Sequence, residues 1–358
     1  MKRFDSIVVH CGLPKTGSTS LQSALMAQAD ALEEAGICYP RVPGFDGNHS
    51  FPILLHLGIQ TYEPFGPVNV HLDVEAWAKI WTDLASGALA PDCNKLLISA
   101  ECLWALPAKE GARFFKFLES MLSDSGVFEA VGLVRHPVSW MNSMRNEFAK
   151  IGFTLTHLST FLDAHWRDPS RLYEVAAELR SATPFVKWHI GRHEELAASG
   201  GIVPDFWSRF TLPGTPPAPT ITNESLCFEA LAVLSILATT PPVDGFNSRL
   251  FQGIAGSPSV PNSEENRVWW ERFAESANAQ LTVWGLPTYS PPKSSPTTNP
   301  WPRSFFNSME QRLDEVDASP AIRKMYWQGV RHAASRTSGW VWLRLQWQLL
   351  THRKWLNP

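Results

Sequence analysis

A group of residues near the start of the chain could bind a phosphate group. The apolar run 7–9 leads into a segment that contains Gly12, Lys15 and Gly17, and three hydroxyl side chains follow at 18–20. This order predicts a buried strand that passes through a glycine loop into a helix. The first N–H groups of a helix have no intrahelical partner, and the helix dipole places about half a positive charge there. The segment therefore predicts an anion site.

Side chains of the predicted loop add charge and hydrogen-bond donors to this site. Lys15 supplies a full positive charge, and Ser18 and Thr19 supply hydroxyl groups at the helix start. The pattern from Gly12 is close to the Walker A motif, but Ser18 occupies the position of that motif's lysine. The loop is therefore expected to bind a phosphoester other than the β- and γ-phosphates of a nucleoside triphosphate.

A second candidate phosphate site follows the run FEAVGLV at 128–134, which predicts a strand. Arg135 comes directly after this run, and Ser143 lies eight residues further along the chain. Arginine suits phosphate because its planar fork donates two parallel hydrogen bonds. The spacing alone leaves open a structural ion pair for Arg135, and it does not show that Ser143 reaches the same phosphate.

The two motifs together resemble the phosphate-binding motifs of sulfotransferases that use 3′-phosphoadenosine 5′-phosphosulfate (PAPS), most closely the bacterial carbohydrate-type branch. The resemblance runs from residue 6 to about residue 240. It implies that PAPS is the co-substrate, that no metal is required, and that Lys15 offsets charge on the sulfuryl and leaving oxygens. It also implies a set of donor-binding residues: Pro14, Lys15, Thr16, Gly17, Ser18, Thr19, Arg135 and Ser143.

Two residues are candidates for the base that accepts the proton of an acceptor hydroxyl. Glu101 ends the segment LLISAE, which resembles a segment of the bacterial relatives. His49 lies in the segment 41–70, which is predicted to be a functional loop, and its ordinary pKa of about 6.5 suits proton transfer. Each residue also has a role without catalysis as its alternative. Glu101 could form an ion pair with Lys15 or Arg135, and His49 could be a solvated loop histidine.

The elements that must position these residues alternate along the chain. Strands are predicted at 7–9, 95–99, 128–134 and 184–188, with helical patterns at 21–32, 72–84 and 108–122. Alternation of this kind predicts an α/β fold with a mostly parallel sheet flanked by helices, and the resemblance adds the P-loop-like sulfotransferase fold. The carboxyl ends of parallel strands meet at one edge, so Glu101 and Arg135 are expected there. His10 is expected beneath the loop as a hydrogen-bonding partner.

Proline-rich segments predict the domain organisation. The predicted parts are a sulfotransferase domain at 1–286, with a core at 1–210 and a helical part at 211–286, then a linker at 287–302 and a helical tail at 303–358. Within the tail, residues 318–358 hold seven basic residues and no acidic one, whereas the rest holds 24 basic and 34 acidic residues. This tail is predicted to pack on the acidic body or to lie on a membrane surface.

Composition narrows the class and location of the protein. Apolar residues make up 44% of the chain, as in a globular protein with a substantial core. The five cysteines are widely spaced without a C-x-x-C pair, which indicates neither a disulfide framework nor a zinc site. The sequence has no run of roughly 18 apolar residues and no signal-peptide pattern at its start. We expect a cytoplasmic protein, with peripheral binding at the inner membrane face as the alternative.

These features predict a sulfotransferase that moves the sulfuryl group of PAPS to a hydroxyl of a carbohydrate, glycolipid or other glycoconjugate by in-line displacement. No nucleic-acid partner is expected. One alternative is a P-loop-type kinase, which predicts Mg²⁺-dependent binding of ATP. The other is a non-catalytic module that binds a nucleotide or a glycan, which predicts donor binding without turnover.

Overall fold

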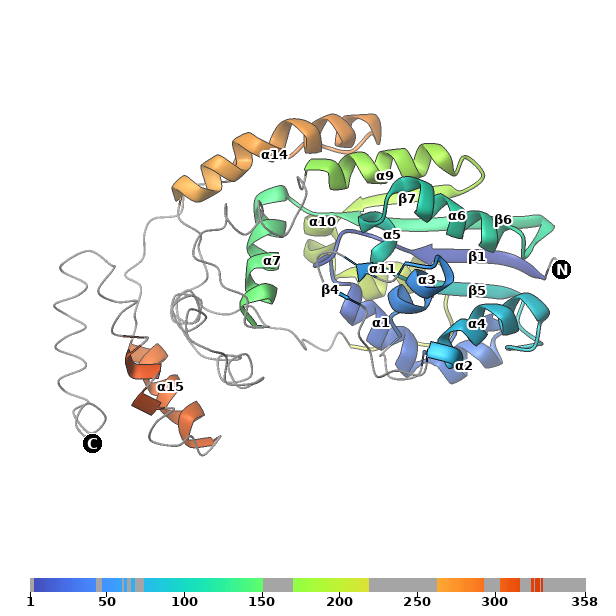
Figure 1. Cartoon of the computed structure of the whole chain (residues 1–358), viewed down its shortest axis with the longest axis horizontal. Helices are drawn as coiled ribbons and strands as arrows, with labels where there is room; N and C mark the ends of the chain where they lie inside the picture. The colour runs from blue at the N-terminus through green and yellow to red at the C-terminus, as the bar shows by residue number, and fades with distance from the viewer. Residues whose placement is uncertain are drawn as a thin grey trace. The chain divides into compact units, whose positions relative to one another are not determined.

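Figure 1 shows the computed structural model of the chain. The structure describes residues 3–42, 47–59, 61–62, 66–67, 74–150, 170–218, 263–292, 303–315, 323–324, 326–328 and 330. Contacts divide the chain into two units. Unit 1 comprises Met1–Pro137, His165–Thr222 and Glu271–Ser290, and unit 2 comprises Val138–Ala164, Asn223–Trp270 and Pro291–Pro358. The domain bounds expected from the proline-rich segments stay a prediction.

A five-stranded sheet of order β2-β5-β1-β6-β7 forms the centre of unit 1 (Figure 1). Its strands are β1 (Phe4–His10), β2 (Ile37–Cys38), β5 (Lys95–Ser99), β6 (Leu122–Val134) and β7 (Lys187–Arg192). All four strand pairings are parallel, which confirms the predicted α/β class. A separate antiparallel pair joins β3 (Thr61–Tyr62) to β4 (Gly66–Pro67). The parallel arrangement brings the carboxyl ends of the long strands to one edge of the sheet.

Helices connect the strands and flank the sheet. In unit 1 they are α1 (Ser18–Ala27), α2 (Ala29–Glu34), α3 (Ser50–His56), α4 (Val74–Ser86), α5 (Cys102–Ala105), α6 (Ala108–Glu119), α9 (Ser170–Ala182), α10 (His193–Ala198) and α11 (Ile202–Arg209). Unit 2 holds α15 (Arg303–Glu315) and nearly all of α7 (Pro137–Lys150), and the unit boundary falls within α14 (Ser263–Val283). No helix in the described part of the chain is long and apolar enough to cross a membrane.

Apolar side chains point alternately to the two faces of the sheet, and helices pack on both faces. On one face, Val8 of β1 packs with Leu21 of α1 and Phe206 of α11 in a buried apolar cluster. On the other face, Phe115 of α6 stacks on Phe128 of β6, with ring centroids 5.4 Å apart. Successive strand residues point to opposite faces, and full burial of such a side chain stabilises the fold by roughly 1.5–3 kcal/mol. The two packed layers hold the carboxyl edge of the sheet in place.

The fourth long strand differs from its predicted position. The sequence predicts a strand over 184–188, but β7 runs from Lys187 to Arg192, opposite Glu129 to Val134 of β6. Residues 184–186 form a turn in which the N–H of Val186 donates to the oxygen of Thr183 at 3.0 Å. β7 is an edge strand with partly exposed side chains, so it lacks the continuous apolar run of a central strand. Arg192 therefore ends this strand at the carboxyl edge.

Most of the basic tail lies outside the described residues. Of residues 318–358, the structure describes only 323–324, 326–328 and 330. The two alternatives for the tail, packing on the body and binding at a membrane surface, both remain predictions.

Candidate active site

The glycine loop, residues 11–17, joins β1 to α1 at the carboxyl edge of the sheet. Its first half continues beside β6, because the N–H of Leu13 donates to the oxygen of Leu133 at 3.0 Å. A Cβ at Gly12 would lie 2.9 Å from the nitrogen of Leu133 and 3.2 Å from its oxygen. Only glycine allows the two backbones to approach this closely.

The second half of the loop makes a sharp turn. Lys15 and Gly17 both adopt the left-handed conformation, with φ angles of 67° and 93°. Thr16 is fully buried, and its hydroxyl donates to the oxygen of Leu13 at 2.7 Å. A left-handed backbone at a residue other than glycine costs roughly 1–3 kcal/mol and persists only where its surroundings enforce it. The loop at Lys15 is therefore held in a strained shape, as is common at binding sites.

The start of α1 presents donors that the helix itself does not use. Leu21 is the first residue whose N–H donates within the helix, to the oxygen of Gly17 at 3.2 Å. The N–H groups of Ser18, Thr19 and Ser20 precede it and have no intrahelical acceptor. The hydroxyl of Ser18 is buried and has no hydrogen-bond partner in the described structure, whereas Thr19 is exposed. These groups are candidate donors to an anion, and of the hydroxyls of Ser18 and Thr19 only that of Ser18 is buried.

Arg135 lies directly against the glycine loop. Its Nη1 donates to the backbone oxygen of Lys15 at 2.5 Å. The hydroxyl of Tyr173 donates to the backbone oxygen of Arg135. The Nε of Arg135 is buried and has no hydrogen-bond partner among the described residues. Burial lowers the pKa of Arg135, and the carboxylate of Glu194 opposes this shift. The structure thus brings a desolvated guanidinium to the loop.

Glu101 lies at the same edge, at the end of β5. The N–H of Ala100 donates to the oxygen of His10 at 2.9 Å, so β1 and β5 stay paired up to the residue before Glu101. Glu101 is half-buried and immediately precedes α5. Glu101 therefore follows the strand that pairs with β1, and β1 leads into the glycine loop.

The interpretation of His49 as a base on a flexible loop is not supported by the structure. His49 is fully buried and directly precedes α3, so part of the predicted loop is helical. Its Nε2 donates to the oxygen of Pro40 at 2.8 Å, and its Nδ1 accepts the N–H of Ser99 at 3.2 Å. Burial lowers its pKa to about 4. The short helix was hard to foresee because Pro52 occupies its first turn, where a proline is tolerated.

His10 is also fully buried, beneath the loop. Its Nδ1 lies 2.9 Å from the hydroxyl of Ser99, and its ring meets that of Phe206 edge-on, with centroids 6.3 Å apart. Burial lowers its pKa to about 4, so the ring is neutral at physiological pH. His10 therefore links β1 to β5 by a hydrogen bond between neutral side chains.

The structure describes the burial of two further predicted donor-binding residues, Pro14 and Ser143. Pro14 is buried within the glycine loop. Ser143 is half-buried in α7 and belongs to unit 2. Whether it shares a phosphate with Arg135 stays a prediction.

Sequence reasoning missed a charged cluster beside Arg135. Arg192, Glu194 and Tyr289 lie together, because the guanidinium carbon of Arg192 is 4.4 Å from the Tyr289 ring centroid and the Tyr289 hydroxyl is 3.5 Å from Glu194 Oε2. The sequence predicts that the fourth strand ends at residue 188, so it does not identify Arg192 as a strand-end residue. Tyr289 follows α14, far from the other two along the chain, so no local pattern could reveal it.

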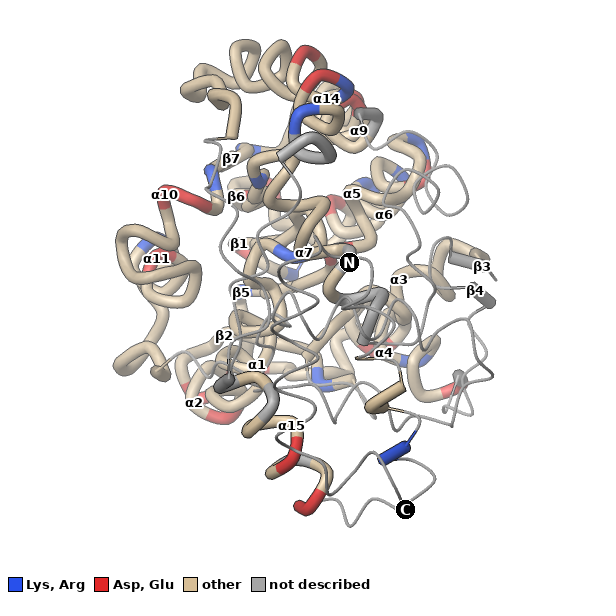
Figure 2. Tube along the Cα trace, turned by 90° about the vertical axis from the view of Figure 1, so that its left-hand side faces the viewer, with Lys and Arg blue, Asp and Glu red and all other residues tan. Residues whose placement is uncertain are grey.

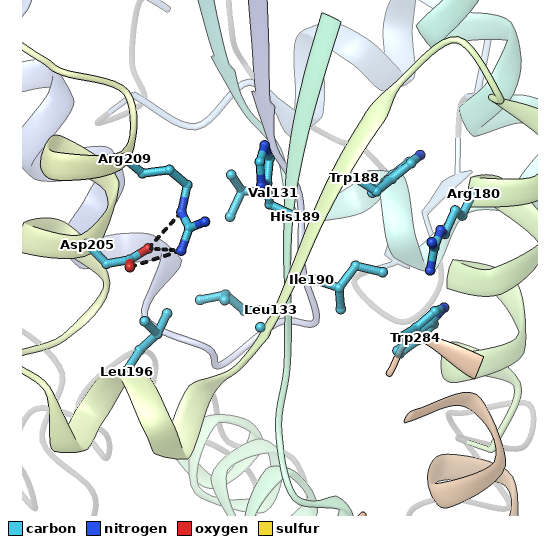
Figure 3. Close-up of a pocket in the computed structure, with 11 residues that line it drawn as sticks. Val131, Leu133, Arg180, Trp188, His189, Ile190, Leu196, Asp205, Arg209 and Trp284 are labelled. Carbon is cyan, nitrogen blue, oxygen red and sulfur yellow. Dashed lines mark hydrogen bonds and ion pairs between the residues drawn. The ribbon is translucent and has the colours of Figure 1, made fainter. Parts of the chain in front are cut away.

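A cavity of about 240 Å³ runs along β7 and contains no residue of the glycine loop (Figure 3). Figure 3 shows the ion pair of Arg209 with Asp205 on one side of the strand and the rings of Trp188 and Trp284 on the other. The remaining lining residues are Val131, Leu133, Arg180, His189, Ile190, Gly191 and Leu196. None of the predicted catalytic or donor-binding residues lines this cavity.

The chain was compared with protein families, curated proteins and solved structures. No protein-family model matches the chain, and no curated protein matches it significantly. Among solved structures, a crystal structure of a sulfotransferase from Alicyclobacillus acidocaldarius is similar, with a TM-score of 0.44 and 12% sequence identity. The match covers 80% of this chain and 98% of that one. At these values the likeness assigns neither a fold family nor an activity to the chain.

Proposed function

We propose that the protein is a sulfotransferase that moves the sulfuryl group of PAPS to a hydroxyl of a carbohydrate or glycoconjugate. The supporting observation is the hydrogen bond from Arg135 to the backbone of Lys15. It joins two motifs that stand 120 residues apart and that separately resemble the two phosphate motifs of sulfotransferases. A site that holds both phosphates of one donor needs these two motifs side by side.

In this proposal the donor is held at the start of α1 and by Arg135. The first N–H groups of α1 and the enclosed hydroxyl of Ser18 bind the 5′-phosphate, because an unpaired buried hydroxyl costs roughly 1–3 kcal/mol and a phosphate oxygen satisfies it. Arg135 binds the 3′-phosphate, which gives its buried Nε an acceptor. Lys15 contributes its charge to the sulfuryl and bridging oxygens.

The chemical step then needs one proton acceptor. The acceptor hydroxyl gives its proton to the carboxylate of Glu101, and its oxygen forms a bond to sulfur. The bond between sulfur and the bridging oxygen breaks, and adenosine 3′,5′-bisphosphate leaves. Lys15 offsets the negative charge that develops on the leaving oxygen, and positioning and electrostatics supply most of the acceleration. His49 is not proposed as the base, because both of its ring nitrogens bind the backbone.

Calorimetric titration of the full chain tests the proposal with three ligands: adenosine 3′,5′-bisphosphate, adenosine 5′-phosphate, and ATP with Mg²⁺. We expect tightest binding of the bisphosphate, with the same affinity in the presence of a metal chelator. Preference for ATP with Mg²⁺ would contradict the proposal in favour of a kinase. Absence of binding for all three would make the glycine loop a structural turn.

A second measurement separates the enzyme from a binding module. PAPS is incubated with the protein and a panel of polysaccharides and glycolipids, and release of the bisphosphate is followed. Acceptor-dependent release supports the transferase. Tight donor binding without release for every acceptor favours the non-catalytic alternative.

A further inference from the structure

A second arginine ends a strand beside Arg135. β6 and β7 pair in parallel with Val134 opposite Arg192, so Arg192 is level with the residue that precedes Arg135. Adjacent strands lie about 4.8 Å apart. The two arginines therefore leave neighbouring strands at the same edge of the sheet.

The surroundings of Arg192 hold its side chain in place. Its guanidinium carbon lies 4.4 Å from the centroid of the Tyr289 ring, a cation–π contact. The amide of Asn278 in turn fixes Tyr289: its Oδ1 accepts the Tyr289 N–H at 2.7 Å and its Nδ2 donates to the Tyr289 oxygen at 3.1 Å. Only 17% of the Arg192 side chain is exposed. Its orientation is thus set before any ligand binds.

Both arginines keep a buried donor without an acceptor. The Nε atoms of Arg135 and Arg192 are buried, and neither has a hydrogen-bond partner in the part of the chain that the structure describes. A buried donor left unsatisfied costs roughly 1–3 kcal/mol, and more when the group is charged. Each of the two arginines, at the ends of adjacent strands, therefore has a buried donor that a bound acceptor could satisfy.

The nearby carboxylates do not supply that acceptor. Glu194 accepts the N–H of His136 at 2.8 Å on Oε1 and the Tyr289 hydroxyl at 3.5 Å on Oε2, and within the described residues it forms no ion pair with either arginine. Glu195 pairs with Arg192 at 3.1 Å but is half exposed, and such a pair contributes at most about 1 kcal/mol. Both glutamates belong to α10, the acidic helix beside β7 in Figure 2.

The pKa values of the neighbouring His136 and His193 depend on burial and on the charges of the arginines and Glu194. Burial is the main cause that lowers the pKa of His136 and of His193. For His136, the hydrogen bond to the Ser290 oxygen and the carboxylate of Glu194 oppose this shift, and Arg192 adds to it. For His193, Arg135 adds to the shift and Glu194 opposes it. Arg135 and Arg192 both contribute positive charge at this edge, and a bound anion would offset the cost of burying that charge.

We infer that Arg192 is a second cationic ligand of the phosphate group that Arg135 binds. This inference rests on the proposed function, which assigns the 3′-phosphate of the donor to Arg135. Two planar guanidinium groups on adjacent strands can donate to different oxygens of one phosphate, and each has an Nε–H available for that bond. The phosphate then supplies the acceptor that Glu194 and Glu195 do not.

The substitution Arg192→Gln tests the inference, because glutamine keeps most of the side chain and removes the charge. We expect binding of adenosine 3′,5′-bisphosphate to weaken by about 10- to 100-fold, and binding of adenosine 5′-phosphate to change by less than about threefold. Arg192→Lys should restore part of the loss. Arg209→Gln is the matched control, since Arg209 pairs with Asp205 on α11, and it should change neither affinity.

The outcomes separate this inference from the proposed function. Failure of the wild-type protein to prefer the bisphosphate would overturn the proposed function. An unchanged affinity of Arg192→Gln for the bisphosphate, or an equal loss for both nucleotides, would overturn the inference alone. Circular dichroism checks folding, and if Arg192→Gln unfolds, Arg192→Lys carries the test, with a selective loss of at least about fivefold expected from removing the planar fork.

Discussion

Glu101 and His49 can both accept a proton, but the fold gives them different surroundings. Glu101 is half-buried at the carboxyl edge, beside the strand that enters the glycine loop. His49 is fully buried, with one ring nitrogen donating to Pro40 and the other accepting from Ser99. A proton taken up by His49 would place a positive charge in a fully buried, desolvated site. Glu101 is therefore the residue to test as the base.

Glu101→Gln removes the proton acceptor and keeps the size of the side chain. We expect donor affinity to stay within about tenfold of wild type, while acceptor-dependent turnover of PAPS falls by about 10²- to 10⁴-fold. Calorimetry measures the first quantity and release of adenosine 3′,5′-bisphosphate the second. Glu34→Gln, on the exposed side of α2, is the control and should leave both unchanged. Wild-type turnover by Glu101→Gln would remove Glu101 from the mechanism.

At the scale of elements, the junction of β1, the glycine loop and α1 depends on a close backbone contact. The loop continues beside β6 through the hydrogen bond between Leu13 and Leu133. That contact is possible only because Gly12 has no Cβ. The loop then turns at Lys15, where Arg135 donates to the backbone oxygen. The position of the proposed anion site thus depends on β6 as well as on the loop itself.

Gly12→Ala should displace the loop, because the added Cβ would lie 2.9 Å from a backbone nitrogen that cannot move freely. We expect at least a tenfold loss of affinity for adenosine 3′,5′-bisphosphate, together with roughly 1–3 kcal/mol lower stability. Calorimetry and urea unfolding measure the two effects. Gly58→Asn is the control, because a Cβ at Gly58 meets nothing within 4 Å and asparagine tolerates its left-handed backbone. An unchanged affinity in Gly12→Ala would show that the loop geometry does not matter for binding.

At the scale of the whole molecule, two buried histidines couple stability to pH. His10 and His49 each have a pKa lowered to about 4 by burial, against an ordinary value of about 6.5 in the unfolded chain. Between these values the unfolded chain binds more protons than the folded one, so stability rises with pH. The contribution is complete above about pH 6.5 and is lost as the pH falls toward 4.

The free energy of unfolding should therefore fall by about 2 kcal/mol for each of these histidines between pH 7.5 and pH 5. Urea unfolding at both pH values, followed by circular dichroism, measures the change. His49→Gln should be less stable than wild type at pH 7.5 but lose about 2 kcal/mol less on acidification. If the two proteins lost the same amount, His49 would not be the buried neutral group that the structure describes.

The sequence by itself determined the α/β class, the glycine loop and the helix start at Ser18, because apolar runs, glycines and hydroxyl groups act over a few neighbouring residues. It also singled out Arg135 as a strand-end arginine. Only the tertiary structure decided that His49 is buried and that Arg192 ends the edge strand beside Arg135. Burial and strand register depend on partners far along the chain: His49 is 50 residues from Ser99, and Arg135 is 120 residues from Lys15. Local patterns carry no information about such contacts, so these assignments required the fold.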